Sequence, residues 1–270
     1  MSKTEQRNPN TTHIDKMTSL EMAQVMQDEN VNAALAVGKV VDKIALAIEE
    51  IGIRINKGGR LFYIGCGTSG RLGVLDASEC PPTYGVSPNL VVGIIAGGER
   101  ALRYSVEGAE DDAALGRDDL AAYNVTDLDT VVGLSVAGNA AYVVGALKHA
   151  KEKGALVIAI SSNEDCKINN IADIKITTDT GAEVITGSTR MKAGTAHKMV
   201  LNMLSTGAMI KYGRVYENFM IHVKPSNIKL CNRSIGIVMQ ITGCSENDAK
   251  NRLIAHNWDI KSAVEGETEK

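Results

Sequence analysis

The residues most suited to chemistry are a glycine-rich turn and two groups of glutamates that follow it. The turn is Gly65-Cys66-Gly67-Thr68-Ser69-Gly70-Arg71, between the apolar run 61–64 and a helix-like run from Leu72. Glycines let the backbone approach a ligand closely, and unpaired amides at a helix start favour an anion. With the hydroxyls of Thr68 and Ser69, the turn is typical of a phosphate cradle. A tight corner without a ligand is the competing interpretation, since neither the nucleotide P-loop nor the dinucleotide fingerprint is present.

Glutamates occur in two segments after this turn. The segment Asp76-Ala77-Ser78-Glu79-Cys80-Pro81-Pro82-Thr83 holds Glu79 at the end of the predicted helix, which the prolines are expected to stop. The helix dipole disfavours an anion there, so we expect a raised pKa that suits a general acid. Glu107 and Glu110 are three residues apart in the segment 106–112 and can share a helical face. Two separated glutamates can act as acid and base, although solvated surface acids are the simpler interpretation.

The distance between the turn and Glu79 raises a geometric question. A straight helix over 70–79 places Glu79 about 14 Å from the phosphate-binding end, which is longer than a sugar phosphate. Either the helix is bent or short, or Glu79 serves a site built with another subunit. We predict the second, an active site at the interface of a homodimer.

Strand and helix patterns alternate through the middle of the chain. Strand-like runs are predicted at 60–64, 90–96, 130–136, 156–161 and 174–177, and helices at 69–79, 99–118, 139–153 and 163–171. This alternation predicts an α/β fold, a three-layer αβα sandwich with a five-stranded parallel sheet. Ligands bind at the carboxyl ends of such strands, where the Gly65 turn lies.

The flanking segments complete the expected organisation. Residues 1–16 are predicted to form an arm or an extended segment. Up to residue 57, two helices are predicted to pack on the core, the first capped by Thr18 and Glu21. Residues 58–220 form the α/β domain and residues 221–270 a small helical appendage, with 214–230 irregular.

Composition excludes several classes of protein. The net charge of −3 and pI near 6.0 do not suggest nucleic acid or an anionic membrane as a partner. The five cysteines form no CxxC pair, which argues against a disulfide framework and a zinc site, and the histidines are scattered. No secretory signal or run of about 18 apolar residues is visible, so we expect a cytoplasmic protein.

Five motifs together make the chain recognisable. They are 65–73, 76–83, 95–98 (Ile-Ala-Gly-Gly), 106–111 and 186–196 (Thr-Gly-Ser-Thr-Arg-Met-Lys-Ala-Gly-Thr-Ala). Together with the start of the chain, Thr4-Glu5-Gln6-Arg7-Asn8-Pro9, they resemble the N-acetylmuramic acid 6-phosphate etherases. These are bacterial enzymes built on the sugar isomerase (SIS) fold.

The resemblance implies cleavage of the lactyl ether of N-acetylmuramate 6-phosphate to N-acetylglucosamine 6-phosphate and D-lactate, in the recycling of cell-wall sugars. It implies a carbon–oxygen lyase without metal or other cofactor, in which Glu79 is the acid and Glu110 the base at C2. The implied substrate-binding residues are Gly67, Thr68, Ser69, Gly70, Ser135, Gly138, Asn139 and Ser188. Relatives usually continue with more helix after Val264, which implies a shortened appendage.

The loop after the third strand departs from the usual SIS pattern. Ala137 and Ala140 stand where hydroxyls are expected, although Ser135, Asn139 and loop amides could compensate. Each lost hydrogen bond to a charged phosphate costs about 1.5–3 kcal/mol, so two could weaken binding about a hundredfold or more. Two alternatives therefore stay open: a non-catalytic SIS module that senses a sugar phosphate, and an aldose–ketose isomerase, against which the Glu-Cys-Pro-Pro stretch argues. A DNA-binding regulator is disfavoured because no basic recognition helix precedes the SIS-like region.

Overall fold

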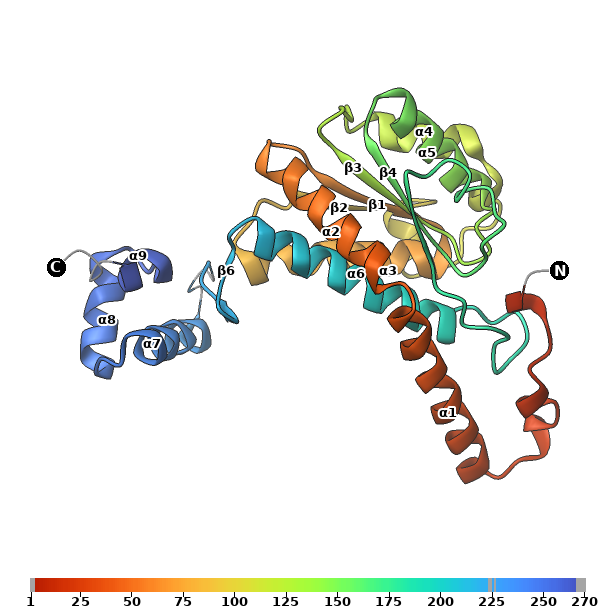
Figure 1. Ribbon diagram of the computed structural model, residues 1–270, viewed down its shortest axis with the longest axis horizontal. Coiled ribbons are helices and arrows are strands. Elements are labelled where there is room, and N and C mark those ends of the chain that lie inside the picture. Colours follow the sequence, from red (N-terminus) through yellow and green to blue (C-terminus); the bar gives the residue numbers. More distant parts are fainter. Residues whose placement is uncertain (1–2, 223–224, 226, 266–270) are drawn as a thin grey trace.

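A five-stranded parallel sheet forms the centre of the computed structural model, which describes residues 3–222, 225 and 227–265 (Figure 1). The strands lie in the order β2 (Val91–Ile95), β1 (Leu61–Gly65), β3 (Thr130–Leu134), β4 (Leu156–Ser161) and β5 (Ile174–Thr177). Leu61 pairs with Val91 on one side and with Thr130 on the other. The predicted fold class is confirmed, and each strand boundary lies within two residues of its predicted position.

Helices cover both faces of the sheet. Leu61 and Tyr63 of β1 face a core formed with α2 (Val41–Asn56), α3 (Gly67–Tyr84) and α6 (Lys192–Lys211). Phe62 and Ile64 face the opposite core, formed with α4 (Ala113–Ala121) and α5 (Ala141–Glu152). Because both faces are covered, β1, β3 and β4 are buried along their whole length, which explains their continuous rather than alternating apolar pattern.

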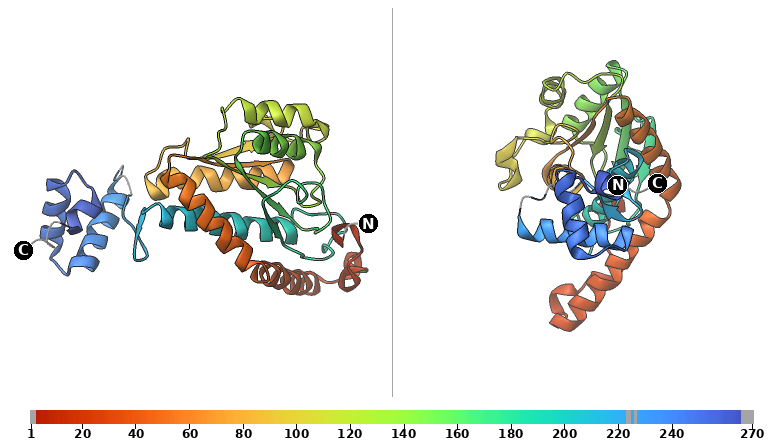
Figure 2. Two further views of the ribbon diagram at one scale, coloured as in Figure 1. Left: turned by 45° about the horizontal axis from the view of Figure 1, so that its top comes forward. Right: turned by 90° about the vertical axis from the view of Figure 1, so that its left-hand side faces the viewer.

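Helix α1 (Ser19–Gly38) extends away from the sheet, as Figure 2 shows. It begins with the predicted capping box, in which the Thr18 hydroxyl accepts from the Glu21 amide and the Glu21 carboxylate accepts from the Thr18 amide. Its outer face exposes Leu20, Val31 and Leu35.

The N-terminal segment, predicted to be an arm or an extended segment, is an arm with local helical turns. It forms three 3₁₀ turns, η1 (Lys3–Glu5), η2 (Pro9–Thr11) and η3 (Ile14–Lys16). The Asn8 amide donates to the carbonyl of Ala182 at 3.2 Å, and the Thr11 hydroxyl donates to that of Val184 at 2.8 Å. Tertiary hydrogen bonds, which local sequence does not reveal, therefore fold the arm onto the loop before α6.

The C-terminal helices form a cluster with its own apolar core. Helices α7 (Ile228–Thr242), α8 (Glu246–Ala255) and α9 (Ile260–Glu265) pack around Val238, Leu253 and Ile260. They lie beyond the far end of α6 in Figure 1, after the short hairpin of β6 (Val215–Tyr216) and β7 (Phe219–Met220). The predicted helical appendage is therefore present, and part of the segment predicted to be irregular forms a hairpin. The exact domain boundaries stay a prediction.

Two predicted helices are wrong in extent. The range 99–118 contains the 3₁₀ turns η4 (Glu99–Leu102) and η5 (Ala109–Asp111) before α4 begins, because Gly98 and Gly108 adopt positive φ angles of 66° and 77°. The range 163–171 contains only turns. There, the Asn169 side chain donates to the carbonyls of Asn163 and Glu164, which replaces helical hydrogen bonds.

The prediction that helix α3 stops before the prolines is wrong. The helix continues through Pro81 and Pro82 and ends at Tyr84, where Gly85 adopts the left-handed conformation and its amide bonds to the carbonyl of Pro81. Interior prolines cost about 3 kcal/mol or more. The burial of Tyr84 and the contact of its hydroxyl with Thr206 offset part of that cost. No helix among the described residues is long and apolar enough to cross a bilayer.

Candidate active site

The turn between β1 and α3 is tight enough to require its glycines. A Cβ on Gly70 would lie 2.6 Å from the carbonyl oxygen of Gly65, and Gly67 has a φ of 52°. The N-cap of α3 is Cys66, whose side chain makes no capping hydrogen bond within the described part of the chain. The first amides of α3 are therefore oriented toward the end of the sheet without an intrahelical acceptor, as an anion site requires.

The loop after β3 lies beside this turn, because β1 and β3 are neighbouring strands. The Ser135 hydroxyl accepts from the Gly138 amide at 3.1 Å, and the Asn139 side chain donates to the carbonyl of Ala137 at 3.1 Å. Gly138 has a φ of 74°, and a Cβ there would lie 2.2 Å from the Cys166 sulfur. The polar side chains of this loop thus stabilise its own backbone.

A cavity of about 400 Å³ joins the two loops. Six of the predicted site residues line it: Gly67, Thr68, Ser69, Glu110, Ser135 and Asn139. The remaining wall residues include Cys66, Asp111, Ala137, Ala140, Thr189 and Gly194. The two alanines face the cavity, as the departure from the SIS pattern predicted. Thr189 and Gly194 were missed, although both belong to the motif 186–196 that carried the resemblance.

Glu110 lies on the cavity wall close to the glycine turn. It belongs to η5, which follows the left-handed Gly108. Burial raises the pKa of the Cys66 thiol, and the negative charges of Glu110 and Asp111 raise it further, to about 12. The cavity therefore holds a neutral thiol at physiological pH, beside two carboxylates at the edge of the glycine turn.

Relatives with similar sequences decide the family. The N-acetylmuramic acid 6-phosphate etherase of Caldanaerobacter subterraneus is 52% identical over 97% of this chain and 85% of its own length. That of Glaesserella parasuis is 52% identical over 97% of this chain and 86% of its own length. The chain belongs to the N-acetylmuramic acid 6-phosphate etherase family. Family models of the glucokinase regulatory protein N-terminal SIS domain (43–151), the SIS domain (110–207) and a UBA-like domain (238–265) also match.

Solved structures support the SIS fold. A phosphoheptose isomerase from Francisella tularensis superposes with a TM-score of 0.57 at 19% identity, covering 71% of this chain and 98% of that one. The Vibrio vulnificus NanR protein, complexed with ManNAc-6P, has a TM-score of 0.52 at 14% identity and covers 72% of this chain and 65% of that one. At these identities the likeness concerns the fold alone.

The remaining site residues expected from the etherase resemblance lie outside the cavity wall. Gly70 and Gly138 shape the two turns, and Ser188 lies next to the wall residue Thr189. Glu79 is exposed on α3, nine residues and about 14 Å along the helix from Gly70. Within one protomer, the structure therefore places Glu110 on the cavity wall and leaves Glu79 apart from it.

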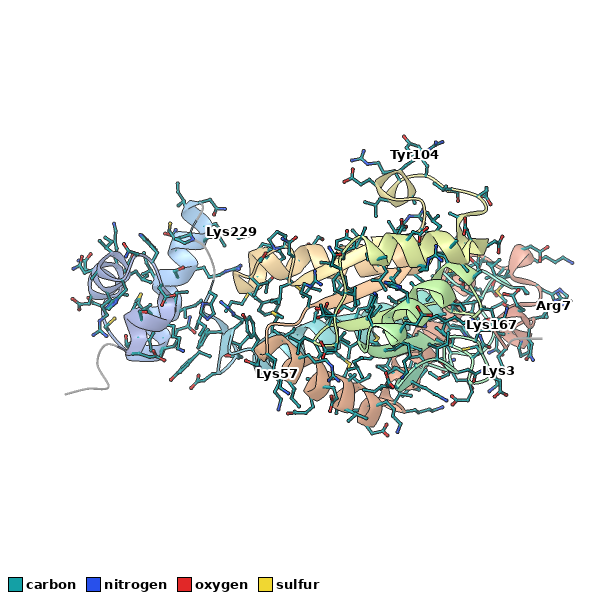
Figure 3. All side chains as sticks on the ribbon, turned by 90° about the horizontal axis from the view of Figure 1, so that it is seen from above. Lys3, Arg7, Lys57, Tyr104, Lys167 and Lys229 are labelled. Carbon is teal, nitrogen blue, oxygen red and sulfur yellow. The ribbon has the colours of Figure 1, made fainter. Side chains whose placement is uncertain are left out.

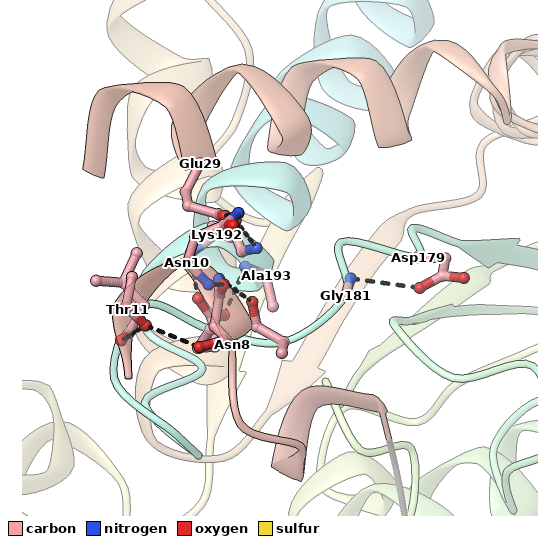
Figure 4. Close-up of polar contacts among 11 residues, drawn as sticks. Asn8, Asn10, Thr11, Glu29, Asp179, Gly181, Lys192 and Ala193 are labelled. Atoms are coloured by element: carbon pink, nitrogen blue, oxygen red, sulfur yellow. Dashed lines mark hydrogen bonds and ion pairs between the residues drawn. The ribbon is translucent and has the colours of Figure 1, made fainter. Parts of the chain in front are cut away.

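Buried charged residues position the motif 186–196, which contributes Thr189 and Gly194 to the cavity wall. The Glu183 carboxylate accepts from the amides of Lys192 and Ala193, both at 3.0 Å, and so occupies the N-terminus of α6. The Lys192 ammonium pairs with Glu29 of α1, beside Asn8 and Asn10 of the N-terminal arm (Figure 4). The motif 186–196 is thus connected to α1 by the Lys192–Glu29 pair, and Asn10 of the arm donates to the same glutamate.

Proposed function

We propose that the protein cleaves the lactyl ether of N-acetylmuramate 6-phosphate, giving N-acetylglucosamine 6-phosphate and D-lactate. One observation carries the proposal: a single cavity combines Thr68 and Ser69 at the start of α3, which we propose to hold the phosphate, with the carboxylate of Glu110. The names of relatives that are 52% identical support the same substrate. The reaction makes the protein a carbon–oxygen lyase of amino-sugar catabolism, acting in the cytoplasm without a cofactor.

A mechanism of elimination followed by hydration needs two carboxyl groups, one as base and one as acid. Opening of the sugar ring exposes an aldehyde at C1, which acidifies the proton on C2. Glu110 takes that proton as general base, the C3–oxygen bond breaks, and a second acid protonates the oxygen that leaves with lactate. Water then adds across the resulting double bond, with hydroxyl at C3 and hydrogen at C2. Atoms balance without an oxidant or reductant.

Glu79 is the proposed acid, and its position on α3 requires a second subunit. Leu75, one helical turn before it, is 49% exposed, so an apolar side chain and a carboxylate share the outer face of α3. A homodimer that covers this face would bring Glu79 of one protomer to the cavity of its partner. The exposed Leu20, Val31 and Leu35 of α1 offer further apolar surface for such an interface.

Phosphate binding in this scheme depends mainly on the first loop. The amides at the start of α3 and the hydroxyls of Thr68 and Ser69 supply donors. The Ser135 oxygen accepts a bond from Gly138, so its own hydrogen is available to a phosphate oxygen. The Asn139 amide group donates to Ala137 and its oxygen accepts from the Lys167 amide at 3.3 Å, so Asn139 contributes less.

A lactate assay tests the proposal directly. Incubation of the purified protein with N-acetylmuramate 6-phosphate should release D-lactate in equal amount to N-acetylglucosamine 6-phosphate. The alternative function, a sugar-phosphate sensor, is favoured by Ala137 and Ala140 on the cavity wall. Saturable binding of the substrate without any lactate release would establish the sensor and reject the lyase.

A further inference from the structure

A second, smaller cavity adjoins the first beneath the loop that carries Glu110. It measures about 130 Å³ and shares Cys66, Gly67 and Glu110 with the larger cavity. The loop around Tyr104 covers it and stands out from the body of the protein, as Figure 3 shows. Glu110 therefore borders both cavities.

Arg71 supplies the positive charge of the small cavity. Its Nε donates to the carbonyl of Leu102 at 3.1 Å and its Nη2 to that of Tyr104 at 3.5 Å. Among the described residues, no carboxylate lies within ion-pair distance of this guanidinium. A guanidinium has five N–H donors, so donors and the full charge are available to an anion.

The two larger cavities lined by the loop after β3 offer no equivalent. Within the described residues, the wall of the 400 Å³ cavity carries no lysine or arginine. A neighbouring cavity of about 540 Å³ is lined by Lys3, which already pairs with Asp179. In the part of the chain that the structure describes, Arg71 is thus the one basic side chain on these three walls without a carboxylate partner.

The proposed substrate carries two anions, a phosphate on C6 and a carboxylate on the lactyl group at C3. We propose that Arg71 binds the lactyl carboxylate and so selects N-acetylmuramate 6-phosphate over sugar phosphates without a lactyl group. The inference rests on the proposed function and names a specificity residue of that site. C3 is adjacent to C2, so with Glu110 at C2 the lactyl group lies on the side of the small cavity.

Two carboxylates on the same wall mean that a lactyl carboxylate needs the positive charge of Arg71 to bind there. Glu107 and Glu110 both border the small cavity, and both are exposed to solvent. Without Arg71, a third carboxylate in this space would meet only negative charge. When Glu110 takes the C2 proton it becomes neutral, so repulsion of the departing lactate falls during the reaction.

The test compares two ligands that differ only in the lactyl group. Calorimetric titrations in the Glu110→Gln background, where turnover does not consume the ligand, give the Kd values of N-acetylmuramate 6-phosphate and N-acetylglucosamine 6-phosphate. Arg71→Met should weaken the first by about tenfold to a hundredfold and leave the second within about twofold. Arg71→Lys, which keeps the charge but loses the planar fork, should lie between.

Arg103→Met is the matched control, because Arg103 belongs to the same loop but is exposed and lines neither cavity. An equal loss for both ligands would assign Arg71 to loop anchoring alone and overturn the inference, as would unchanged binding of both. Retained binding of N-acetylglucosamine 6-phosphate also reports that the variant is folded. The proposed function is tested by a different measurement: if it is wrong, the unmodified protein releases no lactate.

Discussion

The ammonium group of Lys192 pairs with the carboxylate of Glu29 in the protein interior, although 163 residues separate them. The two side chains are only 3% and 5% exposed. Burial raises the pKa of Glu29, but hydrogen bonds from Lys192, Asn8 and Asn10 and the charge of Lys192 outweigh it and lower that pKa from 4.5 to about 2. The pair joins α1 to the start of α6, where Gly194 borders the cavity.

This pair predicts how stability depends on pH. A carboxyl whose pKa is lowered on folding stabilises the protein above its unfolded pKa, and the contribution is lost as pH falls through the folded value. For Glu29 this window runs from about 4.5 down to about 2, and the contribution amounts to about 3 kcal/mol. Urea unfolding as a function of pH should show a steeper loss of stability in this window for the unmodified protein than for Glu29→Gln.

At pH 7, Glu29→Gln should lower the free energy of unfolding by about 3–5 kcal/mol, because it leaves the Lys192 ammonium buried without its partner. The double variant Glu29→Gln, Lys192→Met should recover part of that loss. The exposed pair of Glu49 and Lys211 provides the control, and Glu49→Gln should cost less than about 1 kcal/mol. Equal effects of the two glutamate variants would contradict the role given to burial.

Glu79 and Glu110 make a prediction about subunit composition. Each Gln variant alone should lose lactate release, since one lacks the proposed acid and the other the base. If Glu79 acts on the partner's cavity, co-expression of Glu79→Gln with Glu110→Gln places both intact glutamates at one site of each mixed dimer. Random assembly should then restore about a quarter of the unmodified activity. Activity no higher than that of the separate variants would place both residues in one subunit or remove Glu79 from the mechanism.

The strands and the tight glycine turn after β1 could be predicted because their signals are local. Val, Ile and Leu runs bounded by turn residues mark each strand, and the glycines of 65–70 mark a turn that needs close backbone approach. The missed features depend on tertiary contacts. Thr189 and Gly194 border the cavity near the start of α6, which Glu183 and Glu29 contact from distant segments. Helix α3 continues past Pro81 to Tyr84, which is buried.

Ala137 gives a prediction that strengthens binding. It lies on the cavity wall between Ser135 and Asn139, where a hydroxyl could donate to a bound phosphate. Ala137→Ser should lower the Kd of N-acetylglucosamine 6-phosphate by about tenfold, the lower range for a hydrogen bond to a charged group. Ala255→Ser at the exposed end of α8 is the control and should leave the Kd unchanged. A Kd that does not fall for Ala137→Ser would place the phosphate away from the second loop.

Gly70 predicts a selective loss of function. A methyl group there would lie 2.6 Å from the Gly65 carbonyl oxygen and 2.6 Å from the Ile95 side chain, so Gly70→Ala must displace the first turn of α3. Moving the amides by about 1 Å weakens hydrogen bonds steeply, so phosphate affinity should fall about tenfold or more.

Gly236 in α7 is the matched control: a methyl group added there would have no neighbour within 4 Å, and alanine favours the helix by about 1 kcal/mol. Gly236→Ala should therefore leave phosphate binding unchanged and raise the unfolding midpoint. If Gly70→Ala binds the sugar phosphate as tightly as Gly236→Ala does, the amides of this turn do not form the cradle.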